Sequence, residues 1–208
     1  MLAATLSTPT STSARMLFLP GGERVAVRFA GPDDAEMLQA YVRQLSAKAR
    51  YNRFFGPLIE LSPAELDRVM HINGPNHATL IAQTGDSKPV MIGELRYAVL
   101  SETTCEFSIS VADDWYRKGL GHLLLRDLQC RLQAQGIKSL VGDVLRSNEA
   151  MLAFARKAGF SIASQSRDAR SLRIVKDIFP ARALVASDEL VSPAGRMVAE
   201  RQLRVVSA

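Results

Sequence analysis

The segment CEFSISVADDWYRKGLGH, residues 105–122, decides how the whole chain is interpreted. Phe107, Ile109 and Val111 alternate with polar residues, which is the period of a half-buried strand. Gly119 and Gly121 then lead into a strongly periodic helix. At such a junction, free backbone N–H groups point outwards and add to the positive end of the helix dipole. The segment therefore predicts an anion site.

The spacing of the glycines narrows the kind of anion site. A dinucleotide fingerprint needs a third glycine where this chain has Leu124, and a P-loop needs a Gly-Lys-Ser/Thr sequence that this loop lacks. A two-glycine loop preceded by Arg117 and Lys118 remains, and it suits a pyrophosphate. Taken alone, the two glycines could equally serve only to make a tight strand-to-helix connection.

Downstream of the loop, Leu120, Leu124, Leu128 and Leu132 predict a helix from Gly119 to Gln135, which Gly136 ends. Asn148 is expected to cap a helix that runs to Ala158. The remaining pattern predicts a strand over 139–145 and a closing hairpin over 160–166 and 171–176.

Upstream of the loop, alternation predicts strands over 23–29, 78–83, 90–99 and 105–111. A helix is expected to begin at Gly31-Pro32-Asp33-Asp34, and a second short one follows through Phe54. Ser62 and Glu65 form a capping box that opens a helix to about Ile72.

The length of 208 residues suits one domain, which we place at 23–179. Residues 1–22 are rich in Ser, Thr, Ala and Gly, and they are predicted to be a flexible segment outside the fold. Residues 180–208 are weakly patterned, and we expect a tail that is disordered or that packs on a partner.

Residues 105–122 resemble motif A of the GNAT superfamily of N-acetyltransferases, a Gln/Arg-x-x-Gly-x-Gly/Ala loop after a strand. Residues 147–160 resemble motif B, with Asn148 opening a helix that ends at Gly159-Phe160. The stretch from Leu45 to Pro63 is similar to the N-terminal helices of bacterial protein lysine acetyltransferases. The resemblance implies an α/β (α+β) fold with a mixed, twisted sheet of about six to seven strands flanked by helices.

The resemblance also implies acetyl-CoA as the cosubstrate, with no metal. Backbone atoms of Ile109, Ser110 and Val111 would bind the pantetheine arm, and Asn148 would touch it. The pyrophosphate would lie on a loop composed of Tyr116, Arg117, Lys118, Gly119, Leu120, Gly121 and His122.

Catalysis needs a base, because a lysine amine with a pKa of about 10.4 is protonated at pH 7, a handicap of about 4 to 5 kcal/mol. Glu106 is the candidate, since it lies on the polar side of its strand and at the position of the proposed catalytic glutamate of the lysine acetyltransferases. The alternative is a solvated glutamate at a strand edge.

Two positions depart from the family pattern. Ala155 stands where the superfamily commonly has a tyrosine that helps the thiolate leave, and Tyr116 replaces the usual Gln or Arg. Three functions stay open: acetylation of a protein lysine, acetylation of a small-molecule amine, and a catalytically weak acyl-CoA sensor. A ping-pong scheme through Cys105 is a minor alternative, and Cys130 is expected in the core.

The net charge of +5 comes from scattered Lys and Arg residues without a basic run, so we expect no nucleic-acid partner. Only two cysteines are present, without metal-ligand spacing, which indicates a reducing, cytoplasmic location. No apolar run is long enough to cross a membrane. The chain is expected to act as a monomer or homodimer.

Overall fold

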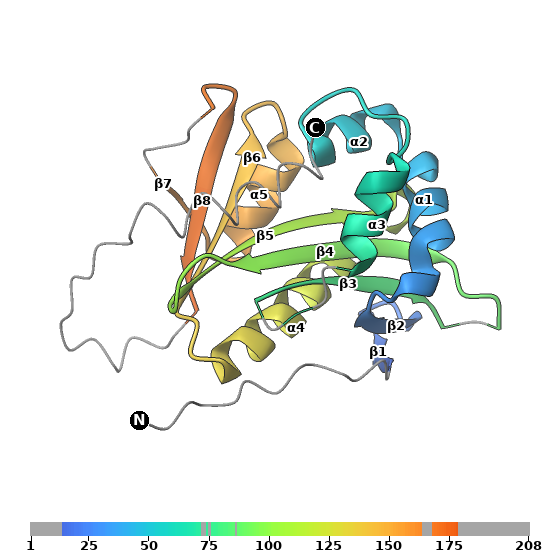
Figure 1. Ribbon diagram of the computed structural model, residues 1–208. Helices are drawn as coiled ribbons and strands as arrows, with labels where there is room; N and C mark the ends of the chain where they lie inside the picture. The colour runs from blue at the N-terminus through green and yellow to red at the C-terminus, as the bar shows by residue number, and fades with distance from the viewer. Residues whose placement is uncertain (1–13, 72–73, 75, 86, 164–167, 179–208) are drawn as a thin grey trace.

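The computed structural model describes residues 14–71, 74, 76–85, 87–163 and 168–178, which form one sheet with helices on both faces (Figure 1). The helices are α1 (Ala35–Gln44), α2 (Ala47–Phe54), α3 (Pro63–His71), α4 (Leu120–Ala134) and α5 (Glu149–Lys157). The strands are β1 (Arg15–Phe18), β2 (Arg24–Phe29), β3 (His77–Thr84), β4 (Met91–Val99), β5 (Thr104–Val111), β6 (Ser139–Leu145), β7 (Ser161–Ala163) and β8 (Ser171–Asp177).

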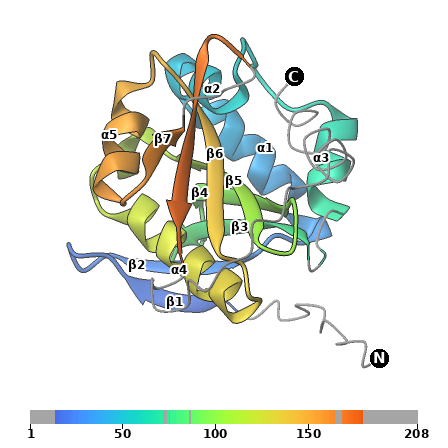
Figure 2. The ribbon, with the colours of Figure 1, turned by 90° about the vertical axis from the view of Figure 1, so that its left-hand side faces the viewer.

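The eight strands form a mixed sheet in the order β1-β2-β3-β4-β5-β6-β8-β7. Only the β5–β6 pair is parallel, and every other neighbouring pair is antiparallel. Figure 2 shows β6 and β8 side by side, with α5 to one side and α1–α3 beyond the sheet. The mixed α/β architecture agrees with the predicted class, although the described sheet has eight strands instead of six or seven.

Most predicted elements are confirmed to within a few residues, because their local signals are strong. The capping box of α3 is formed: Ser62 N donates to Glu65 Oε2 at 2.6 Å, and Glu65 N donates to Ser62 Oγ at 3.3 Å. Gly136 follows α4 with a φ of +82°, a left-handed conformation that glycine adopts without strain.

The N-terminal boundary of the fold was predicted wrongly. Residues 15–18 form β1, which pairs with β2, and Leu19 is buried in the main core. The apolar stretch Met16–Leu19 is too short to show a period, and the turn at Gly22 joins it to β2 as a hairpin. The predictions for residues 1–13 and 180–208 lie outside the described residues.

The main core fixes α4 against the sheet. Leu120, Leu124, Leu128 and Leu132 are almost fully buried, and each contributes about 1.5–3 kcal/mol by leaving water. On β5, Phe107 belongs to this core, so the side chains of alternate residues point to the opposite face. Helices α1–α3 form a second core on that opposite face, and Glu106, Ser108 and Ser110 point towards it.

Candidate active site

The site begins where β5 and β6 separate. These strands pair at Thr104–Ser139, Cys105–Leu140 and Glu106–Val141 and no further, although both continue. The sheet therefore has an internal gap beyond Glu106, open towards the start of α4.

Backbone groups of β5 alternate between β4 and this gap. The Ser110 carbonyl oxygen faces β4, since a Cβ placed on Gly93 would lie 3.2 Å from it. The Phe107 carbonyl oxygen faces β6, since a Cβ placed on Gly142 would lie 3.0 Å from it. Because the alternation has a period of two, Ile109 and Val111 direct their N–H and C=O groups into the gap.

The predicted phosphate loop lies at the end of β5 and leads into α4. Arg117 and Gly119 both have left-handed backbone conformations, with φ of +61° and +90°. The helix begins where Leu123 N donates to Gly119 O at 3.0 Å. The N–H groups of residues 120–122 precede that bond and therefore lack partners within the helix, as the first N–H groups of any α-helix do. Free N–H groups of this kind are the donors with which helix N-termini bind anions.

Gly121 allows α4 to approach α5 closely. A Cβ at this position would lie 3.2 Å from the Phe154 ring, which is tighter than an ordinary contact. The same ring meets the exposed His122 edge-on, with centroids 4.6 Å apart. Helix packing, as well as anion binding, therefore explains the second glycine of the loop.

The other predicted cofactor residues have varied surroundings. Lys118 Nζ lies 4.7 Å from the centre of the Trp115 ring and 3.9 Å from Glu23 Oε1, so its ammonium leans towards the β1–β2 turn. Tyr116 is half exposed, and partial burial together with Asp113 raises the pKa of its hydroxyl. Asn148 caps α5, accepting a hydrogen bond from Met151 N at 3.2 Å.

Glu106 is paired with an arginine that the sequence did not indicate. Arg173 Nη2 on β8 donates to Glu106 Oε1 at 2.8 Å, and Arg173 Nη1 lies 3.4 Å from Asp143 Oδ2. The side chains of Glu106 and Arg173 are 10% and 13% exposed. The carboxylate is thus a buried, compensated charge beside the gap, which excludes the alternative of a solvated strand-edge glutamate.

The cysteines and Ala155 limit the available chemistry. Cys105 is buried, and burial together with Glu106 raises the pKa of its thiol, so a thiolate for a ping-pong scheme is disfavoured. Cys130 is exposed, contrary to the prediction of a core residue, because it lies off the leucine face of α4. Ala155 is buried in the main core and has no proton to donate.

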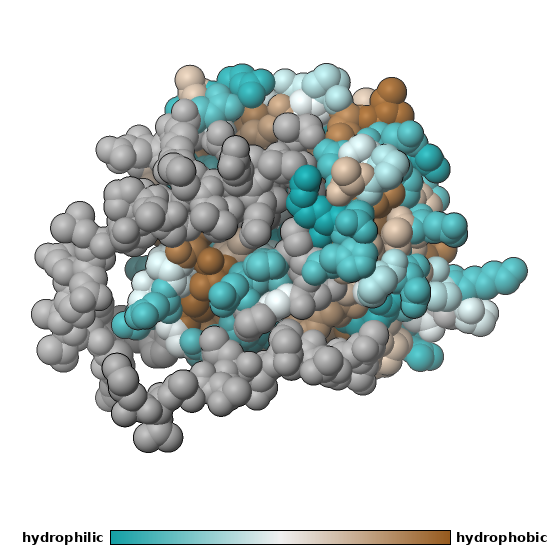
Figure 3. Space-filling view, viewed as in Figure 1, coloured by the Kyte–Doolittle hydropathy of each residue, from teal (hydrophilic) through white to brown (hydrophobic). Residues whose placement is uncertain are grey.

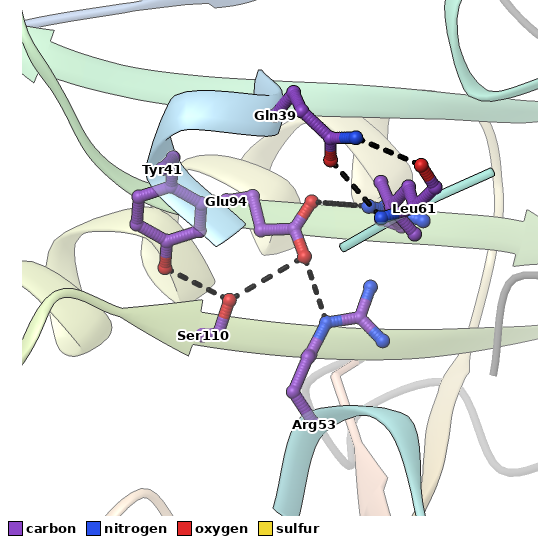
Figure 4. A network of polar contacts seen from close by, with 7 residues as sticks. Gln39, Tyr41, Arg53, Leu61, Glu94 and Ser110 are labelled. Carbon is purple, nitrogen blue, oxygen red and sulfur yellow. Dashed lines mark hydrogen bonds and ion pairs between the residues drawn. The ribbon is translucent and has the colours of Figure 1, made fainter. Parts of the chain in front are cut away.

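A second polar cluster, formed by Tyr41, Arg53, Glu94, Arg96 and Ser110, lies on the α1–α3 face; Figure 4 labels all of its members except Arg96. Glu94 is fully buried; its carboxylate accepts from Arg53 Nε at 2.8 Å and from Arg96 Nε at 2.9 Å. Burial opposes the charge of Glu94, but Arg96 and Arg53 more than offset this and lower its pKa. Ser110 Oγ, which is hydrogen bonded to Tyr41, donates to Glu94 at 3.4 Å.

This cluster is joined to the loop through Asp113. The Asp113 carboxylate accepts hydrogen bonds from Ser46 N at 2.9 Å and from Ser46 Oγ at 2.8 Å. Ser46 is the N-cap of α2. The helix that carries Arg53 is therefore tied to the residues that precede the phosphate loop.

Arg173 and the Arg53–Glu94–Arg96 group were not predicted from the sequence. Arg173 had no local signal, because its partner lies 67 positions away. Glu94 and Arg96 did leave one: two charged residues, two apart, inside the otherwise apolar strand MIGELRYAV. Such a pair lies on one face of a strand and indicates a buried ion pair.

No helix in the described part of the chain is long and apolar enough to span a membrane. Within the same residues, no group of three or more His, Cys, Asp or Glu side chains could hold a metal ion.

The site thus combines an open strand edge with an adjoining helix start, and the family of the chain follows from its similarity to known proteins. The model of the acetyltransferase (GNAT) family matches residues 41–160. The chain belongs to this family. It is 29% identical over 144 residues to the acetyltransferase PA5475 of Pseudomonas aeruginosa, covering 68% of this chain and 77% of that protein.

Two further similarities concern the acceptor and the fold. The chain is 39% identical over 70 residues to the ribosomal protein bS18-alanine N-acetyltransferase of Salmonella typhimurium, covering 34% of this chain and 47% of that protein. The GNAT domain of S. lividans PAT superposes with a TM-score of 0.73 at 24% identity, covering 85% of this chain and 99% of that one.

Proposed function

We propose that this acetyltransferase moves the acetyl group of acetyl-CoA to the side-chain amine of a protein lysine, with Glu106 as general base. The observation that carries the proposal is the position of Glu106, at the last β5–β6 pair and directly beside the gap. A base at this point is next to any group that occupies the open edge of β5. The Glu106 side chain lies on the face of the sheet that α1–α3 cover. The cosubstrate would enter from the opposite face, which α4 covers.

The residues around the gap suit acetyl-CoA. Backbone groups of Ile109 and Val111 would bind the pantetheine arm. The Ser110 backbone faces β4 instead, so the prediction that it also binds the arm through its backbone is wrong. Asn148, at the start of α5, would touch the arm. The N–H groups of the 116–122 loop, with Arg117 at its exposed side, would hold the pyrophosphate. When bound, acetyl-CoA supplies the thioester carbonyl carbon that the amine attacks and the thiolate that departs.

Glu106 would take a proton from the acceptor nitrogen. The acceptor ammonium gives one proton to the Glu106 carboxylate and becomes a neutral amine. The nitrogen then forms a bond to the carbonyl carbon, the carbon–sulfur bond breaks, and the second amine proton passes to solvent while CoA departs as the thiolate. For this step Arg173 must release Glu106, and Asp143, already 3.4 Å from Arg173 Nη1, offers it a second partner. When Arg173 moves from Glu106 to Asp143, the acceptor ammonium would take its place beside Glu106. The Glu106 carboxylate therefore keeps a positively charged partner.

No side chain at position 155 can protonate the departing thiolate. A thiol with a reference pKa of about 8.5 leaves unprotonated at pH 7 at a cost of about 2 kcal/mol, which is less than the handicap of the protonated amine. The base is therefore the more important group.

Two observations favour a protein acceptor. Large apolar side chains are exposed on α2 and in the loop after it, Tyr51 at 40% and Ile59 at 77%. In Figure 3, apolar brown patches interrupt the hydrophilic surface above the helices at the right of the view. The similarity to an enzyme named for an alanine of a ribosomal protein fits a protein acceptor, whereas the methionine sulfoximine acetyltransferase of Pseudomonas aeruginosa, 40% identical over 62 residues, is named for a small-molecule acceptor.

The test is to incubate the purified full chain with acetyl-CoA and with candidate acceptors, and to measure intact masses. A mass increase of one acetyl group on a lysine-bearing protein supports the proposal. Acetylation of small amines alone would replace the protein acceptor with a small-molecule one. Calorimetric binding of acetyl-CoA without any product would identify a sensor.

A further inference from the structure

The Arg53–Glu94–Arg96 group contains one more positive charge than negative. Two guanidinium groups share the single carboxylate of Glu94, and the other members of the cluster, Tyr41 and Ser110, are neutral. Burial lowers the pKa of Arg96 to about 10, and the nearby Arg53 acts in the same direction. A buried positive charge is unfavourable without a compensating anion. The neighbouring group in which Glu106 and Asp143 share Arg173 carries the opposite excess, so the case for a bound anion rests on the unused hydrogen-bond donors.

Unused hydrogen-bond donors show where that anion would bind. Arg53 Nη2 and Arg96 Nη1 are buried and have no hydrogen-bond partner among the described residues. Figure 4 shows Arg53 reaching from α2 to Glu94 with its two terminal nitrogens free of dashed lines. The side chains of Arg53 and Arg96 are only 4% and 5% exposed, so a bound anion would be shielded from water.

Ser108 connects this group to the proposed base. It is the register partner of Arg96 on β5, and its Oγ is also buried without a partner among the described residues. It lies two residues from Glu106 on the same face of the strand, a distance of about 7 Å at the rise of an extended chain. The unused donors therefore lie on the same face of the sheet as the Glu106 side chain, the face covered by α1–α3, close to the proposed base.

We propose that Arg53, Arg96 and Ser108 form a subsite for a carboxylate of the acceptor. Guanidinium groups that are shielded from water form strong, charge-assisted hydrogen bonds with carboxylates, and a serine hydroxyl can add a third donor. The inference rests on the proposed acetyl transfer. It narrows the acceptor to amines that carry a carboxylate about 7 Å from the reacting nitrogen, which is the spacing between Glu106 and Ser108 along the strand. Such a carboxylate is supplied by an acidic residue beside a protein lysine or by a free amino acid.

The experiment compares matched acceptors. One pair consists of lysine peptides with a flanking Glu or Gln, which differ in charge but have nearly the same shape. The other pair consists of free lysine and lysine amide, and it tests whether the carboxylate comes from a free amino acid. We expect the Glu peptide to exceed the Gln peptide in kcat/KM by roughly tenfold, mostly through KM, as for a hydrogen bond to a charged group. If instead free lysine exceeds its amide while the peptides are equal, the carboxylate comes from an amino acid.

Variants test the assignment of the residues. Arg53→Gln leaves Glu94 paired with Arg96, and Arg96→Gln leaves it paired with Arg53, so neither strands the carboxylate. Either change should bring the Glu/Gln ratio close to one. The control is Arg43→Gln on α1, which removes the same charge from an exposed arginine paired with Glu60 and should leave the ratio unchanged.

Calorimetric binding of the two peptides to the protein with CoA gives a readout that needs no turnover. A Glu preference in binding that both arginine variants abolish supports the subsite, even if no acceptor is acetylated and the proposed function fails. Equal binding and equal turnover of all matched pairs would overturn the subsite and leave the acetyl transfer standing.

Discussion

Replacing Glu106 with glutamine removes the proposed base and little else. The amide has the same shape, and its oxygen can still accept from Arg173 Nη2, which lies 2.8 Å from the carboxylate in the native chain. Arg173 also keeps Asp143. The change in the free energy of unfolding should therefore stay within about 3 kcal/mol, the upper range for a hydrogen bond between charged groups.

The effect on turnover should be much larger and should depend on pH. A positioned general base contributes roughly 10²–10⁴-fold, so kcat at pH 7 should fall by that factor. Without a base, the rate follows the fraction of neutral amine, which rises about tenfold per pH unit up to a pKa of about 10.4. The ratio of native to variant turnover should accordingly shrink as the pH is raised.

The assay is the rate of lysine acetylation, measured by mass spectrometry between pH 7 and pH 10, with acetyl-CoA affinity measured by calorimetry. Asp127→Asn is the matched control, because it also removes a buried carboxylate paired with arginines, Arg15 and Arg131, but one on α4 that has no part in the proposed step. It should keep the native pH profile. If Glu106→Gln turns over normally at pH 7, or if both variants lose activity equally, the base assignment is wrong.

Four further experiments have definite expected outcomes. Maleimide should label the exposed Cys130 quickly and the buried Cys105 only after unfolding; labelling of both at equal rates would contradict the burial. Because the pKa of Cys105 is raised in the folded state, only the unfolded thiol ionises above pH about 8.5, so the free energy of unfolding should fall by up to about 1.36 kcal/mol per pH unit there. Cys105→Ala should remove that slope in urea titrations, and an unchanged slope would assign it to other groups. Leu124→Ala, at a fully buried position of α4, should cost about 2–5 kcal/mol in the same titration. Asp113→Asn weakens the cap of α2 and should cost about 1 kcal/mol, whereas an unchanged midpoint would mean that its bonds to Ser46 contribute nothing.

The sequence predicted what depends on local chemistry and missed what depends on distant partners. The leucines of α4, the capping box at Ser62 and the loop glycines act within a few residues, so their patterns are readable in one chain. The strand at Arg15–Phe18 exists only because β2 is beside it. Likewise, Glu106 could be placed on the polar side of β5, but its pairing with Arg173 depends on the order of β6 and β8, which no local pattern encodes.

The three residue pairs between β5 and β6 are a short seam between two halves of the sheet. Helix α4 packs on β4 and β5, whereas α5 follows β6, so the contact between Gly121 and the Phe154 ring connects the two halves beyond the seam. The Phe154 ring lies between α5 and the start of α4 and keeps the two helices apart. Its size helps to set how far apart the two halves of the sheet stand beyond the seam.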